Sequence, residues 1–268
     1  MSRKTAIALA VALVAALILS SVAYAITIVV DGNREALWNG NGVQTPGTAS
    51  DPNEPNINDN VDIMTFQWTN DQTNMYFLIS TWAPPLMPNL APVDICLNTD
   101  NSASTNIPAT NTIQRNRCSY GTGVNGIDTV AEGFRQNNVL FLNVYNVTTD
   151  PPTLKGTGVL GYAPVTNPTA PNPVVEMSVP LSLLGFGPGN CPATIPTVVY
   201  YDGGDTNPDD NLPDTGAINI NCGTPTAVTL NSLHAQPTTP PIVPAALIGV
   251  SAVALIGVVL FARRRKSA

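Results

Sequence analysis

Residues 64–79, MTFQWTNDQTNMYFLI, contain the pattern that decides the fold. Met64, Phe66 and Trp68 alternate with polar residues, and a period of two is typical of a β-strand with one buried face. Residues 69–73 are polar and suit a turn, after which the apolar run 75–79 continues as a second strand. This stretch therefore predicts a β-hairpin.

The chain around this hairpin contains further strand-like runs and almost no helical pattern. The runs are separated by clusters of Asn, Gly, Pro and Asp, and residues 180–184 suggest only a helical turn. Strands at this spacing, without amphipathic helices between them, favour two packed antiparallel sheets over an alternating α/β fold. The sequence therefore predicts an all-β fold, an antiparallel β-sandwich, with strands at 93–97, 139–145, 157–162, 174–179 and 197–201.

The first 25 residues have the composition of a cleaved signal peptide. Arg3 and Lys4 precede an apolar run from residue 6 to about 19, and Ala23-Tyr24-Ala25 has the small-x-small pattern that signal peptidases accept. We expect residues 1–25 to be removed, so that the mature chain begins at Ile26. An uncleaved first helix, which would give a two-span hairpin, is the alternative.

A second apolar segment, residues 242–262, has the length of a transmembrane helix. Its 21 residues are uncharged, and at ~1.5 Å per residue they span roughly the 30 Å hydrocarbon core of a bilayer. The basic tail 263–268 follows, and such charge stays in the cytoplasm. We expect a single-pass protein of the cell membrane, with an extracellular ectodomain at 26–232 and a Pro/Thr-rich linker at 233–241. A buried helix is the alternative for this segment.

The charge of the ectodomain excludes one class of partner. Residues 26–232 hold all eighteen acidic residues of the chain and five basic ones, which gives a net charge of −13. The phosphate backbone of a nucleic acid would be repelled by this surface, so we expect no nucleic acid partner. The same charge suits solubility in salty surroundings or the binding of divalent cations, and composition does not separate the two.

The ectodomain contains four cysteines, which an oxidising compartment would allow to pair in three ways. We predict the two local disulfides, Cys96 with Cys118 and Cys191 with Cys222, because each closes a long irregular loop. Metal binding through sulfur is the weaker alternative. The chain has no Cys-x-x-Cys motif, and its one histidine lies in the linker.

Several motifs along the ectodomain together resemble a known family. They are the opening Asp31-Gly32 and Trp38, an acidic stretch, the turn Trp68-Thr-Asn-Asp71, the segment from Asp94 to Asn101, and the closing Glu176-x-x-x-Pro180-Leu181. Their order and spacing resemble the carbohydrate-binding module family 9 and its DOMON-like relatives over most of the ectodomain. This resemblance implies a β-sandwich that serves in sugar binding, in calcium-stabilised surface domains or in haem-binding electron transfer, so it does not specify one activity.

Trp82 is the best candidate for a sugar-binding platform. A pyranose ring stacks its C–H face on an aromatic ring while its hydroxyls form hydrogen bonds. Trp82 ends a strand and opens the loop Trp82-Ala-Pro-Pro85, where it can be exposed, and Tyr76 is the second candidate. We expect Trp38 and Trp68 in the core. A Trp82 that covers a sheet edge is the alternative.

The segment 201–214 has the composition of a calcium-binding loop. Carboxylate and amide oxygens are the ligands that calcium prefers, and the candidates here are Asp202, Asp205, Asp209, Asp210 and Asp214. Asn98 and Asp100, with Asn101, form a smaller second cluster. The spacing does not match an EF-hand. A solvated acidic turn is the alternative, because Asp, Asn, Gly and Pro are also the residues that long turns select.

The sequence gives little support for catalysis. The ectodomain has no histidine, no Gly-x-Ser-x-Gly motif and no zinc-ligand set. Haem binding, which the resemblance includes, would need axial ligands, and the residues available for this are Met64, Met75, Met87, Met177 and Lys155.

These observations predict a non-enzymatic cell-surface protein for extracellular recognition or envelope structure. Calcium is the candidate cofactor and no other is expected. The membrane is the expected partner of the C-terminal helix, and a glycan or another surface protein is the candidate partner of the ectodomain. A carbohydrate-binding module is the alternative function, and a haem-binding electron-transfer domain is a weaker one.

Overall fold

The computed structural model describes residues 28–39, 46–118, 126–163, 173–187, 192–204 and 209–222. The predicted signal peptide, linker, transmembrane helix and basic tail lie outside these residues and stay predictions. Within the described ranges, the structure contains no helix with the length and apolar character needed to cross a membrane.

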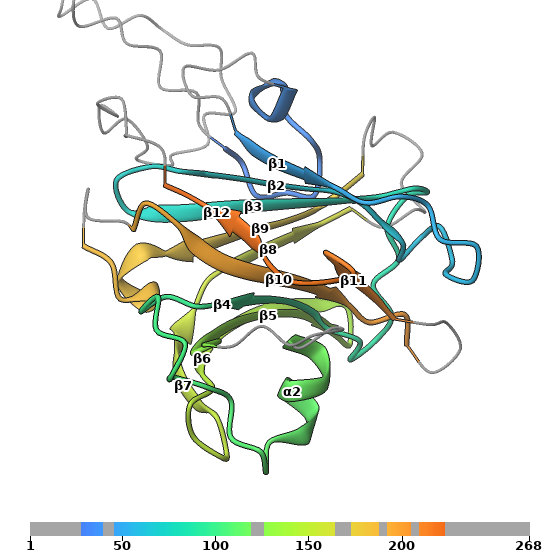
Figure 1. Ribbon diagram of the computed structural model, residues 1–268. Helices are drawn as coiled ribbons and strands as arrows, with labels where there is room; N and C mark the ends of the chain where they lie inside the picture. Colours follow the sequence, from blue (N-terminus) through green and yellow to red (C-terminus); the bar gives the residue numbers. More distant parts are fainter. Residues whose placement is uncertain are drawn as a thin grey trace, which may run out of the picture. The chain divides into compact units, whose positions relative to one another are not determined.

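The described strands form two antiparallel sheets, as predicted (Figure 1). The first sheet has the order β1 (Gly47–Ser50), β2 (Ile63–Asn70), β3 (Asn74–Thr81), β9 (Val175–Pro180) and β8 (Val159–Tyr162). The second has the order β11 (Asp210–Leu212), β10 (Ile195–Tyr201), β4 (Val93–Leu97), β5 (Thr129–Gln136), β6 (Val139–Asn146) and β7 (Thr153–Thr157). Strand β12 (Ile218–Ile220) also pairs with β10.

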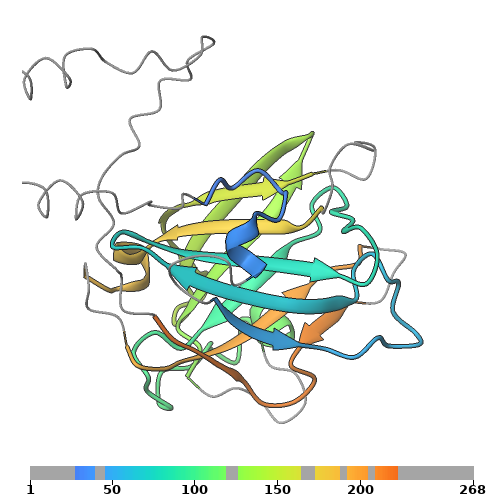
Figure 2. The same ribbon diagram turned by 90° about the horizontal axis from the view of Figure 1, so that it is seen from above.

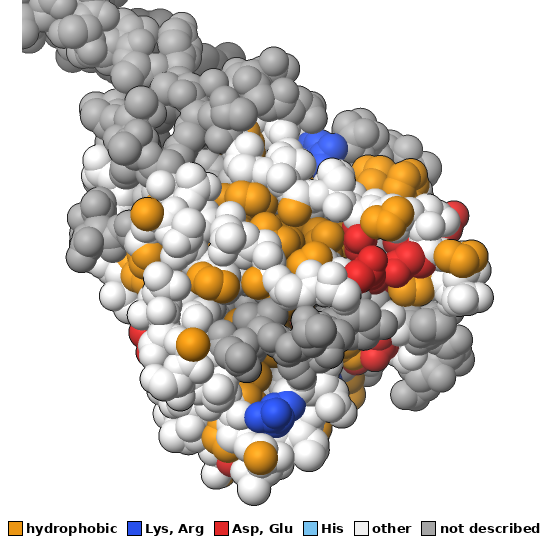
Figure 3. Space-filling view, in the orientation of Figure 1, with side chains coloured by type: hydrophobic (Ala, Val, Ile, Leu, Met, Phe, Trp, Pro, Cys, Tyr) orange, Lys and Arg blue, Asp and Glu red, His pale blue; other side chains and the backbone are white. Residues whose placement is uncertain are grey.

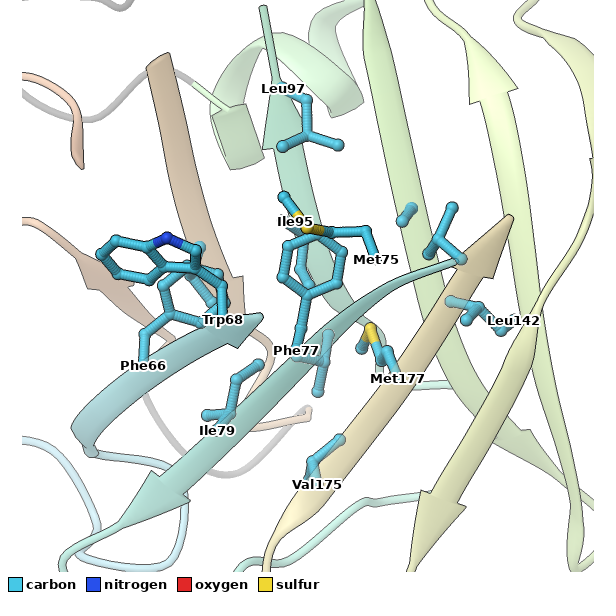
Figure 4. Close-up of a cluster of buried hydrophobic side chains, with 14 of the residues drawn as sticks. Phe66, Trp68, Met75, Phe77, Ile79, Ile95, Leu97, Leu142, Val175 and Met177 are labelled. Atoms are coloured by element: carbon cyan, nitrogen blue, oxygen red, sulfur yellow. The ribbon is translucent and has the colours of Figure 1, made fainter. Parts of the chain in front are cut away.

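The main core lies between the two sheets, which the view from above shows one over the other (Figure 2). Phe66, Trp68 and Phe77 of the first sheet share one buried cluster with Ile95 and Leu142 of the second (Figure 4). Phe66 stacks on Phe77 with ring centroids 5.7 Å apart. Complete burial of each such side chain contributes about 1.5–3 kcal/mol, so this layer holds the sheets together as a β-sandwich.

The predicted hairpin is β2 and β3, paired from Ile63 opposite Thr81 to Asn70 opposite Met75. The register shifts between Ile63 and Thr65, so one extra residue stands in β2 at this point. As a result Ile63 is in the core with Phe66 and Trp68, whereas Met64 is only half-buried. The prediction that Met64 shares one buried face with Phe66 and Trp68 is therefore wrong for Met64.

The run predicted as one strand at 157–162 is divided between the two sheets. Residues 153–157 form β7, at the edge of the second sheet, and residues 159–162 form β8, at the edge of the first. Gly158 lies at the crossing, where a Cβ would collide with the carbonyl oxygen of Ser178. Only glycine allows the backbone to pass this close.

A short helix, α2 (Thr112–Cys118), covers part of the outer face of the second sheet (Figure 1). The disulfide between Cys96 of β4 and Cys118 of α2 confirms the first predicted pairing. Buried apolar side chains, including Ile127, Val130 and Val198, form a second small core around it. The 3-10 helices are η1 (Ala36–Asn39) and η2 (Leu181–Leu184), and η2 is the predicted helical turn.

Candidate functional site

The carboxylates predicted as one calcium loop are divided between two places. Strand β11 begins at Asp210, and Asp209 is the residue before it. Asp209 accepts a hydrogen bond from the Tyr200 hydroxyl at 2.6 Å and one from Gly203 N at 3.2 Å. Asp202 accepts one from Gly204 N at 2.7 Å. Asp205 lies outside the described residues.

Asp210 and Asp214 meet a different set of carboxylates, from the loop between β1 and β2. The ligand atoms of Asp51, Glu54 and Asp214 lie within 4.8 Å of one another, as do those of Glu54, Asp62 and Asp210. Glu54 belongs to both groups. We call these five residues, Asp51, Glu54, Asp62, Asp210 and Asp214, the acidic cluster.

The acidic cluster lies where the two sheets meet at one edge. Its loop residues flank β1 and β2 of the first sheet, and the others belong to or follow β11 of the second. Ile63 N donates to Asp210 Oδ2 at 2.6 Å, and Glu54 N donates to Asp62 Oδ2 at 2.9 Å. Figure 3 shows a group of acidic side chains together on the face of the molecule seen in Figure 1.

The members of the acidic cluster make one another harder to ionise. Burial raises the pKa of Asp51 to about 7, and the charges of Asp210, Asp214 and Asp62 add to this rise. Burial also raises the pKa of Glu54 to about 8, with Asp210 and then Asp214 as further causes. Burial likewise raises the pKa of Asp62 and of Asp210. The cluster therefore holds protons near neutral pH when no cation is bound.

The second predicted calcium cluster has its oxygens in use within its own turn. Asn98 Oδ1 and Asp100 Oδ1 both accept from Ser102 N, at 3.1 and 2.8 Å. Asp100 Oδ2 accepts from the Thr105 hydroxyl at 2.6 Å, and this bond is the main reason why the pKa of Asp100 is lowered. These contacts are typical of a hydrogen-bonded turn.

The two sugar-binding candidates differ in exposure. Trp82 is 43% exposed and opens the loop after β3, as expected, whereas Trp38 and Trp68 are buried. The backbone of this loop is bonded to the acidic loop, through Trp82 N to Asp62 O at 3.1 Å and Ala83 N to Asp59 O at 2.7 Å. Tyr76 is half-buried, and its hydroxyl donates to Asp71 Oδ2 at 2.7 Å. Trp82 is thus the one candidate whose ring faces solvent.

A third group of ionisable side chains lies beneath α2. Asp94 of β4 and Glu132 of β5 are directly opposite each other across the strands. Arg117 Nη1 lies 3.4 Å from Asp94 Oδ2 and 3.1 Å from Glu132 Oε1, and the guanidinium is 5.7 Å from the centre of the Tyr200 ring. Burial, and next the charge of Glu132, raise the pKa of the fully buried Asp94 to about 8 although Arg117 opposes this. We call this group the Arg117 network.

Several residues that carry the family resemblance meet at Glu176. Its Oε2 accepts from Asp31 N at 3.1 Å and from Gly32 N at 3.0 Å, while Oε1 accepts from Trp38 Nε1 at 3.0 Å. Glu176 is fully buried in β9. The opening Asp-Gly, the tryptophan and the closing glutamate therefore anchor the segment 28–39 to the first sheet.

The remaining predicted residues have structural contacts or lie outside the described ranges. Met75, Met87 and Met177 are fully packed in the core, and Lys155 Nζ donates to the Thr129 hydroxyl at 3.2 Å. Cys222 packs against the main core. Its predicted partner Cys191 is not among the described residues, so this disulfide stays a prediction.

No family model, curated protein or solved structure matches this chain. The resemblance to the carbohydrate-binding module family 9 therefore stays an expectation.

Asp51, Glu54 and Asp62 are not among the site residues predicted from the sequence. The available signal was the density of Asp, Glu and Asn in residues 51–62, which follows a short strand and precedes the hairpin. That density alone does not reveal that these residues meet Asp210 and Asp214, because about 150 residues separate the two segments.

Proposed function

We propose that this protein is a non-enzymatic cell-surface protein whose β-sandwich ectodomain serves in extracellular recognition or envelope structure. The observation that carries the proposal is the disulfide between Cys96 and Cys118. Such bonds persist in oxidising compartments and are rare in the cytosol. The predicted signal peptide and transmembrane helix support the same location.

The arrangement of polar groups agrees with a displayed, structural domain. Glu176 and Asp71 are saturated by local donors, and Asp94 and Glu132 share Arg117. These side chains hold segments of the fold in place. The exposed loop after β3, with Trp82, is free to contact a partner.

Protease treatment of intact cells tests this proposal. With an epitope tag after the basic tail, we expect protease to remove the ectodomain and leave a short tagged fragment. Thiol titration of the purified, denatured protein without reductant should detect no thiol, and four after reduction. A full-length band that survives protease, or thiols detected without reductant, would contradict the proposal.

The second candidate is carbohydrate binding, and the observation that favours it is the 43% exposure of Trp82. The loop from Trp82 to Leu86 contains two prolines, Pro84 and Pro85, which restrict the backbone and reduce the entropy lost on binding. Asn60 Nδ2 holds this loop through Pro84 O at 2.6 Å. A rigid loop with one exposed indole is a suitable platform for a sugar ring.

A glycan array with the purified protein checks this candidate. If a glycan binds here, Trp82→Ala should weaken binding at least about tenfold, because an aromatic platform contributes more than about 1.4 kcal/mol. Leu86→Ala is the matched control, since Leu86 is 37% exposed in the same loop but cannot stack on a sugar. Absence of any bound glycan, or equal loss in both variants, would argue against the candidate.

A further inference from the structure

We propose that the acidic cluster binds a divalent cation of the calcium class, held by carboxylates from both sheets. The described part of the cluster has carboxylate oxygens without hydrogen-bond partners, no neutralising basic side chain, and oxygens spaced as around an ion. Cation binding there does not depend on the proposed function.

Buried carboxylate oxygens without hydrogen-bond partners converge in the cluster. Asp62 is fully buried, and its Oδ1 has no partner, while its Oδ2 is fixed by Glu54 N. Asp51 is 8% exposed, and its Oδ2 is also unpartnered, as is Glu54 Oε2. A buried polar atom without a partner is costly, and more so when it is charged. A cation bound among Asp51, Glu54 and Asp214, or among Glu54, Asp62 and Asp210, would give such oxygens a partner.

The acidic cluster has no basic side chain of its own among the described residues. The charged groups that shift the pKa of Asp51, Glu54, Asp62 and Asp210 are other carboxyl groups, Asp59 included.

The Arg117 network shows how this protein neutralises buried carboxylates elsewhere. There, two opposed carboxyls share one guanidinium that the chain itself supplies. The acidic cluster has more carboxyl groups and no such partner in the described structure. The positive charge that neutralises the acidic cluster must therefore come from protons or from a cation in solution.

The spacing and chemistry of the oxygens suit calcium. Oxygens bound to Ca²⁺ at about 2.3–2.6 Å are at most about 5 Å apart across the ion. The ligand atoms of each group in the cluster lie within 4.8 Å of one another. The cluster offers two such groups that share Glu54. Carboxylate oxygens are the ligands that calcium takes in number, whereas magnesium usually keeps several waters and takes few protein ligands.

Calorimetric titration of the full chain in detergent with CaCl₂, after removal of metal by a chelator, tests the proposal. We expect saturable binding of calcium that excess chelator abolishes. At pH 7.5, saturating calcium should raise the unfolding temperature by about 5 °C or more over the chelated protein. The absence of both binding heat and a thermal shift would overturn the proposal.

Matched variants locate the site. Asp214 is half-buried, and Asp214→Asn keeps its shape while removing one charge. This variant should bind calcium at least tenfold more weakly, and its unfolding temperature in chelator should be unchanged or higher, because repulsion in the cluster is relieved. Asp100→Asn, in the other predicted calcium cluster, should bind like wild type. Unchanged affinity in Asp214→Asn, or a loss confined to Asp100→Asn, would contradict the assignment.

Discussion

Replacement of Arg117 with methionine is expected to lower the free energy of unfolding by about 3 kcal/mol or more at pH 8, as is typical when one partner of a buried ion pair is removed. Asp94 and Glu132 lie opposite each other, and Arg117 is the cation that touches both. Methionine retains most of the apolar stem and removes the charge. Denaturant unfolding followed by tryptophan fluorescence measures the loss.

The pH dependence of the stability loss in Arg117→Met separates the lost electrostatic attraction from the lost packing. The raised pKa of Asp94 means that its protonated form stabilises the fold below about pH 4 and that this contribution is lost as the pH rises through about 8. The penalty for losing Arg117 should therefore be larger at pH 8 than at pH 5. Adding Asp94→Asn to Arg117→Met should recover part of the stability at pH 8. An equal penalty at both pH values would point to packing instead.

A matched control is available on the same helix. Arg115 is exposed and donates from Nη1 to Ile107 O at 2.9 Å. We expect Arg115→Met to cost clearly less than Arg117→Met, because polar contacts of an exposed side chain contribute little to stability. A cost equal to that of Arg117→Met would contradict the special role of the Arg117 network.

Replacement of Glu176 with alanine is expected to cost about 3–5 kcal/mol. This change leaves Asp31 N, Gly32 N and Trp38 Nε1 without their acceptor, and each unsatisfied buried donor costs about 1–3 kcal/mol. Water that enters the space would reduce the sum. Thermal and denaturant unfolding measure the effect, and a shift of Trp38 fluorescence should accompany it, because the indole loses its partner.

Glu35 lies beside Glu176, and its charge influences the stability that Glu176 supplies. Burial raises the pKa of Glu176 to about 8, and the neighbouring negative charge of Glu35 is the next cause of this rise. Stability supplied by the protonated Glu176 should be lost as the pH rises from about 4.5 through about 8. Glu35→Gln removes the neighbouring charge, so it should reduce this loss and stabilise the protein at pH 8. If Glu176→Ala cost less than about 1 kcal/mol, the anchoring role of Glu176 would be wrong.

The parts of the fold that local pattern specifies were predictable from the sequence. The hairpin β2–β3 and strands β4, β6, β9 and β10 follow apolar runs bounded by turn residues. Strand β5 was missed because Glu132, Gly133 and Arg135 interrupt its apolar pattern. The structure explains this exception, since Glu132 is neutralised by Arg117 and Gly133 leaves room for Met177.

The candidate site was only partly predictable, because its members meet through tertiary structure. Asp210 and Asp214 were found from local composition, whereas Asp51, Glu54 and Asp62 join them across the sheet interface. Asp209, the residue before β11, instead accepts hydrogen bonds from the Tyr200 hydroxyl and from Gly203 N. Local density of acidic residues does not contain this information.

The crossing at Gly158 has a consequence for how the domain opens. Because β7 and β8 are joined by this single residue, the sheets cannot separate as independent bodies unless one of these edge strands leaves its own sheet. Backbone amides in the centres of both sheets, in β3 and in β4, should therefore exchange with deuterium through one shared cooperative event.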